Sequence, residues 1–272
     1  MAASLILGIA AILALIPVSL QSFRAAAGAF AAPVGAPGRL YWLLLAVAAL
    51  GLFARTVHLL SGGWQPGISG TIWVSMTATL LVFALVTAAM PVAWRLTPLL
   101  GVYLGLLGVI AVLLPEGPAY AGSFDLWLAV HVGVSLAAYA LVSLGALSAL
   151  AVFLQERALK RKEPGTLTRS LPSVADGERL LVLLLTAAAV VLALGILTGM
   201  AELYVISGSV LVFNHKILLS LLGFVAVVGL LLLHQRIGLR GRKAARLMLL
   251  AFLLLTLGYP GVKFVTDVIM TA

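Results

Sequence analysis

The chain has 272 residues, of which 63% are hydrophobic and only 9% are charged. A soluble domain needs roughly 25% charged residues, so this composition excludes a water-soluble globular fold. The net charge of +9 does not indicate nucleic-acid binding, because the basic residues lie in short loops between apolar runs, and the lack of cysteine excludes disulfides and thiolate metal sites.

The first apolar run, residues 4–19, is followed by Arg24 and has no basic residue before it. A cleavable signal peptide has the opposite charge polarity, with its basic residues ahead of the apolar run. We therefore expect a retained first transmembrane helix whose amino-terminal end lies on the non-cytoplasmic side of the membrane.

Runs of about 20 apolar residues are long enough to cross a bilayer, and the chain contains eight of them. They lie near residues 3–21, 39–61, 71–92, 97–114, 126–154, 179–202, 214–234 and 247–269. Spans of this length must be helices, because each backbone polar group inside a bilayer needs a partner within its own segment. The sequence predicts an all-α polytopic membrane bundle, one domain over 1–272 with peripheral helices in 1–122.

Lysine and arginine side chains concentrate in alternate loops. The first, third, fifth and seventh loops and their edges carry Arg24, Arg39, Arg95, Arg157, Lys160, Arg161, Lys162, Arg169, Arg179, Arg236, Arg240, Arg242, Lys243 and Arg246. The loops at 62–70, 115–125 and 203–213 carry none. By the positive-inside rule we expect the basic loops to be cytoplasmic and both termini to lie on the outer, periplasmic side.

The fifth loop, residues 156–178, is the longest polar segment. Its basic cluster is a topology signal, with binding of anionic lipid headgroups as the alternative. Leu171, Pro172 and Ser173 then interrupt the chain ahead of two acidic residues, which is typical of the start of a helix.

The four histidines are the candidates for chemistry inside the membrane, where a histidine usually marks a functional position. His58, near the end of the second span, and His131, near the start of the fifth, lie close to the outer surface. His215 opens the seventh span at that surface, and His234 closes the same span on the cytoplasmic side.

Paired imidazoles from neighbouring helices are a common way to hold an iron porphyrin in a bundle. His58 and His131 are therefore the candidate axial ligands of a haem b iron, and Arg55, one turn from His58, is placed for a propionate. The spacing of His131, Ser135 and Tyr139 predicts an inward-facing stripe. In the alternative interpretation each histidine only hydrogen-bonds to a neighbouring helix.

Other chemistry has little support in the sequence. No hydrolase motif occurs, so we expect no enzyme, and the spans lack the midplane carboxylate that a coupled transporter normally has. Several glycines should let helices pack closely: Gly101, Gly105, Gly108, Gly145, Gly195 and Gly199. The tryptophans should form aromatic belts at the two membrane surfaces: Trp42, Trp64, Trp73, Trp94 and Trp127. The alternative for Trp64 is to shield a haem face.

Three segments resemble the cytochrome c assembly (CcsA/CcmC/HemX-like) family, and in particular its eight-helix YpjD/HemX-type subgroup. They read HVGVSLAAYALVSLGALSALAVFLQERALKRK followed by LPSVADGERLL, HKILLSLLGFVAVVGLLLLHQRIGLRGRKAARL, and RTVHLLSGGWQPG. The first resembles the family's HVxxxxxxYAxF helix. The similarity covers about residues 50–265 and is best over 128–265, within 123–272 of the domain.

The resemblance implies haem handling in the membrane and a role in cytochrome c biogenesis, with His58, His131 and His234 as ligands. His215 stands where many relatives have aspartate, which makes it a substitute outer ligand, and His234 would form a second, cytoplasmic-side site or gate.

The chain also departs from the family pattern. The loop AELYVISGSVLVFN lacks the family's tryptophan-rich WWD motif, and the last span has Lys263 in the region of a histidine. These departures favour haem binding within the bundle over presentation of haem to an apocytochrome. They also leave open a haem-free scaffold or regulatory subunit, whose partners would be membrane lipid and another biogenesis or membrane protein.

Overall fold

The computed structural model is helical in every regular element of the residues it describes, which are 2–28, 36–61, 67–114, 126–163, 165–207, 215–238, 241–257 and 261. Its α-helices are α1 (Ala2–Gly28), α2 (Arg39–Leu60), α3 (Ile68–Ala89), α4 (Thr97–Leu113), α5 (Leu126–Arg161), α6 (Thr166–Ser170), α7 (Val174–Ser207), α8 (His215–Ile237) and α9 (Gly241–Thr256). A 3₁₀ helix, η1 (Pro91–Leu96), connects α3 to α4.

Seven of the described helical segments are long and apolar enough to cross a membrane. They are α1, α2, α3, η1 with α4, α5, α7 and α8. The predicted all-α polytopic bundle is therefore confirmed, and the chain is a multi-pass membrane protein in contact with lipid. The eighth predicted span, 247–269, overlaps α9, which begins earlier at Gly241, but residues 258–260 and 262–269 of that span lie outside the described residues.

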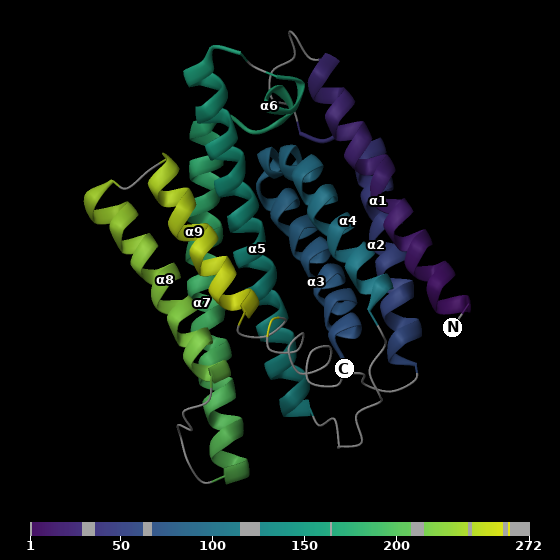
Figure 1. Cartoon of the computed structure of the whole chain (residues 1–272), viewed down its shortest axis with the longest axis vertical. Coiled ribbons are helices and arrows are strands. Elements are labelled where there is room, and N and C mark those ends of the chain that lie inside the picture. The colour runs from purple at the N-terminus through teal and green to yellow at the C-terminus, as the bar shows by residue number, and fades with distance from the viewer. Residues whose placement is uncertain are drawn as a thin grey trace.

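Successive long helices alternate in direction, so the bundle has two ends at which their termini gather (Figure 1). In the amino-terminal half, α1 packs against α2 and α4, and α3 packs against α2 and α4. In the carboxyl-terminal half, α5 packs against α7 and α9, and α8 packs against both of these. The two halves meet mainly where α3 packs against α5.

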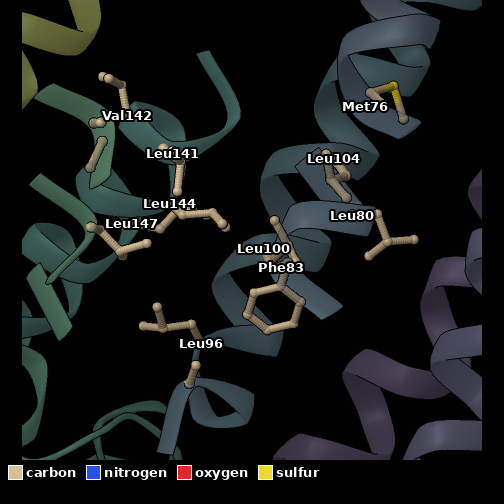
Figure 2. Packing of buried hydrophobic residues seen from close by; sticks show 14 of the residues in the cluster. Met76, Leu80, Phe83, Leu96, Leu100, Leu104, Leu141, Val142, Leu144 and Leu147 are labelled. Atoms are coloured by element: carbon tan, nitrogen blue, oxygen red, sulfur yellow. The ribbon is translucent and has the colours of Figure 1, made fainter. Parts of the chain in front are cut away.

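The central position of α5 follows from its composition. Its residues 140–149 are apolar or small, and nearly all are buried on every side of the helix. A helix that is apolar all round belongs in the interior of a bundle. Figure 2 shows Leu141 and Leu144 of α5 among the buried residues that also include Phe83 of α3 and Leu100 of α4.

The basic side chains mark one end of the bundle, which we call the basic end. It is formed by the ends of α1, α3, α5 and α8 and the starts of α2, α4, α7 and α9 (Figure 1). Its described basic residues are Arg24, Arg39, Arg95, Arg157, Lys160, Arg161, Lys162, Arg169, Arg179, Arg236, Lys243 and Arg246. This segregation is the one that the alternating loops predict, and by the positive-inside rule we expect the basic end to face the cytoplasm.

The fifth predicted loop, residues 156–178, contains more helix than the sequence indicates. Helix α5 has 36 residues, about 54 Å at 1.5 Å per residue, whereas the hydrocarbon core of a bilayer is about 30 Å thick. Its last turns therefore extend past the membrane. The short helix α6, which the sequence pattern does not predict, folds back against α1 and α5.

Two side chains organise this segment. Ser173 caps α7, because its hydroxyl accepts a hydrogen bond from the Asp176 amide at 3.2 Å and donates to the Asp176 carboxylate at 2.7 Å. The predicted helix start after Pro172 is thus confirmed. The Gln155 amide donates to the carbonyls of Thr168, Leu171 and Pro172 at 2.7, 3.3 and 3.0 Å.

We expect Gln155→Ala to destabilise the protein by about 1–3 kcal/mol, because three partly buried carbonyls would lose their shared donor. Thermal unfolding in detergent, followed by circular dichroism, measures the change. Gln235→Ala is the matched control, since Gln235 is exposed near the end of α8. Equal stability of the two variants would show that the amide does not hold the loop.

The close helix packing predicted at the glycines is found at some of these positions only. A side chain at Gly101 would collide with Ser19 of α1, and one at Gly108 would lie 2.7 Å from Ile12 of the same helix. These two glycines therefore allow the close contact between α1 and α4. Gly105 is different, because a methyl group there would meet no atom within 4 Å.

Candidate functional site

His131 forms a polar contact between α5 and α7 at the end opposite the basic end. It lies near the start of α5, half-buried, and its Nδ1 is 3.0 Å from the Thr198 hydroxyl of α7. The Thr198 hydroxyl also donates to the Gly195 carbonyl at 3.0 Å. A Cβ on Gly199 would lie 2.9 Å from His131 Cε1, so the glycine leaves room for the ring.

Arg55 is the second notable group at this end. Its side chain is only 2% exposed, and its guanidinium carbon lies 5.3 Å from the ring centroid of the fully buried Trp73 in α3. This is a cation–π contact, and an adjacent hydrogen bond of 2.7 Å between Thr56 and Thr77 also joins α2 to α3. A buried cation within a membrane span is costly, so it indicates a functional position.

His58 shares the end of α2 with Arg55 but does not share its burial. The His58 side chain is exposed, whereas Arg55, three residues earlier, points into the bundle. Helix α2 packs against α1 and α3, and α5 packs against α3, α7 and α9. Since α3 lies between them, helix packing does not bring His58 directly against His131, and the axial pair stays a prediction.

The other two histidines lie at opposite ends of α8. His215 is its first residue, at the same end of the bundle as His131, but its side chain lies outside the described residues. His234 is near the basic end, where it lines a narrow pocket together with Glu178 and Gly241. The structure therefore separates His234 from the other three histidines, as the sequence predicts.

The pocket near His234 adjoins the start of α9. Gly241, which has a φ of +62°, donates its amide to the Glu178 carboxylate at 3.2 Å. The carboxylate of Glu156 packs directly against the face of Gly241 that a side chain would occupy. Carboxylates from α5 and α7 thus meet at the amino-terminal end of α9, where the helix dipole favours negative charge.

The stripe predicted on α5 is only partly correct. His131 contacts α7, and the Tyr139 hydroxyl lies 3.4 Å from Thr256 of α9, but Ser135 is exposed. Four residues advance about 40° beyond one full turn, so successive members of the stripe face different neighbours.

Tyr139 belongs to a polar contact between the two halves of the bundle. The Tyr103 hydroxyl of α4 donates to the Ser143 hydroxyl at 3.3 Å, and Ser143 donates to the Tyr139 carbonyl at 2.8 Å. Phe252 of α9 lies against both tyrosine rings. Each hydroxyl in this group has a partner, which is typical of polar contacts that hold membrane helices together.

Several site features were not predicted. Thr198 and Tyr103 carry no motif, and for Gly199 the sequence predicts only close packing of helices. The tryptophans also differ from expectation, since Trp73 is fully buried beneath Arg55 and not in a lipid-facing belt, while Trp64 lies outside the described residues. In the part of the chain that the structure describes, no group of three or more acidic or histidine side chains is arranged to hold a metal ion.

Comparison with known proteins gives a family and one relative. The family model for the cytochrome C assembly protein matches residues 38–270. An uncharacterized 28.8 kDa protein in the nifR3-like 5′ region of Azospirillum brasilense is 44% identical over 275 residues, which cover 99% of this chain and 100% of the relative. No solved structure matches. With a match over most of its length, the chain belongs to the cytochrome c assembly protein family.

Proposed function

We propose that this protein binds haem b within its bundle, at the end opposite the basic end, as part of cytochrome c biogenesis in the bacterial inner membrane. Family membership supports the role in cytochrome c biogenesis. The observation that carries the haem proposal is the position of His131, which is anchored through Nδ1 to Thr198. A histidine fixed by one nitrogen keeps the other for a metal. In this proposal the protein handles haem and catalyses no reaction.

The donor groups at this end suit a haem. His131 offers an imidazole, and the buried Arg55 offers a cation for a propionate, which a guanidinium can bind through two parallel hydrogen bonds. The bound haem would be the iron porphyrin that cytochrome c biogenesis delivers to its target protein. The residues of this chain bind it, orient it and shield it from water.

The second axial ligand is His58 or His215. His58 is the partner that the sequence favours, but it would have to reach His131 past α3. His215 belongs to α8, which packs against α7, and Thr198 of α7 contacts His131. The two alternatives differ in which half of the bundle completes the site.

The test is a reduced-minus-oxidised absorbance spectrum of the protein purified with haem supplied. We expect Soret and α bands in the wild type and their loss in His131→Ala. His234→Ala, at the basic end, is the matched control and should keep the bands of this site, and a partial loss in that variant would indicate the second, cytoplasmic-side site that the sequence predicts. Loss of the bands in either His58→Ala or His215→Ala identifies the second ligand. A wild-type protein without bands, or bands unchanged in His131→Ala, would contradict the proposal.

A haem-free scaffold or regulatory subunit is the second candidate function. It is favoured by the exposed lysine and arginine side chains of the basic end, which offer a docking surface for an acidic partner, and by the loop at 201–214, which contains no tryptophan. Purification of the protein with a stoichiometric membrane partner and without bound tetrapyrrole would select this function over haem binding.

A further inference from the structure

The hydrogen bonds around His131 determine which of its ring nitrogens carries the proton. Thr198 has one hydroxyl proton and two neighbours that can accept it, His131 Nδ1 and the Gly195 carbonyl, both at 3.0 Å. If the proton points to the carbonyl, Thr198 Oγ1 accepts a hydrogen bond from His131 Nδ1–H, and both contacts are satisfied. If it points to Nδ1, only one of them is a hydrogen bond.

The arrangement with two hydrogen bonds is favoured. A threonine in a helix commonly donates to the carbonyl three or four residues before it, as Thr198 does to Gly195. Consecutive hydrogen bonds also polarise and strengthen one another in a membrane interior. Since a neutral imidazole carries a single proton, the one on Nδ1 leaves Nε2 as a bare lone pair.

We infer that Thr198 is a positioning residue, which holds His131 in the Nδ1–H tautomer and so presents an unprotonated Nε2 to a metal. Within the described residues, the ring makes its hydrogen bond through Nδ1 alone. Gly199 contributes by letting the ring lie close to α7, where an alanine methyl group would meet Cε1 at 2.9 Å. This inference rests on the proposed function for its purpose, but the tautomer is a property of the haem-free protein.

The tautomer can be measured directly in the haem-free protein. With only four histidines, labelling histidine alone with ¹⁵N gives a simple magnetic resonance spectrum, and His131→Ala assigns the relevant signals. At alkaline pH, where the imidazole is neutral, we expect the wild-type shifts of the Nδ1–H tautomer. The bond to Thr198 corresponds to about a fivefold preference, which Thr198→Val should remove.

Thr198→Ser keeps the hydroxyl and should restore the wild-type tautomer, while valine has almost the shape of threonine and should preserve the packing. Gly199→Ala should displace the ring and give the same loss as Thr198→Val. The signals of the other three histidines are internal controls. In haem titrations, Thr198→Val should bind about tenfold more weakly, a usual effect of losing a hydrogen bond behind a metal ligand.

The outcomes separate the two hypotheses. A wild-type protein in the Nε2–H tautomer, or a Thr198→Val variant with an unchanged tautomer, would overturn the positioning role whether or not haem binds. The expected tautomer with no haem bands in the wild type would leave the positioning of His131 intact and contradict the proposed function.

Discussion

Gly241→Ala is expected to destabilise the protein by about 2–4 kcal/mol. Gly241 has a φ of +62°, and an alanine in that left-handed conformation costs about 1–2 kcal/mol. The new methyl group would also displace the Glu156 carboxylate and disturb the bond from the Gly241 amide to Glu178, which adds a cost of about the same size. Thermal unfolding in detergent, followed by circular dichroism, measures the sum.

Gly238 provides a matched control for the backbone part of this effect. It has a φ of +67°, yet a methyl group there would meet no atom within 4 Å. Gly238→Ala should therefore show the conformational cost alone, and the difference between the two variants reports the crowding by Glu156. Adding Glu156→Ala to Gly241→Ala should recover that difference. Equal destabilisation by both glycine variants would contradict a tight junction at α9.

The bundle itself is predictable from the sequence because the bilayer imposes a simple rule. A span needs about 20 apolar residues with internally satisfied backbone groups, so hydropathy alone identifies α1 to α5, α7 and α8. The charge pattern adds the end of the bundle at which the basic side chains gather. Hydropathy says nothing of polar segments, and this explains why α6 and its attachment through Gln155 were missed.

The candidate site is less predictable, because it depends on which helices are neighbours. Depth follows from position along a span, so His58 and His131 are correctly placed near one end of the bundle. Adjacency follows from side-chain packing, and α3 separates α2 from α5. The partner of His131 is Thr198 of α7, whose significance no spacing in the sequence could indicate.

Arg55→Leu is expected to lower the affinity for haem by about 10- to 100-fold, as is usual when a charge-assisted hydrogen bond of about 1.5–3 kcal/mol is lost. The substitution should leave the fold intact, because leucine suits the apolar surroundings of a membrane helix and a buried ion can often be replaced by an apolar side chain. Arg55→Lys should give an intermediate loss, since an ammonium keeps the charge but not the paired donors. Spectrophotometric titration of the haem-free protein measures each affinity.

Arg95 is the matched control for this experiment. It also lies over a tryptophan, with its guanidinium carbon 5.9 Å from the Trp94 ring centroid, but at the basic end. Arg95→Leu removes a comparable cation–π contact far from His131 and should leave the haem affinity unchanged. Because Arg55 also contacts Trp73, thermal unfolding without haem isolates its structural contribution. Wild-type affinity in Arg55→Leu, or an equal loss in both leucine variants, would show that Arg55 does not bind a propionate.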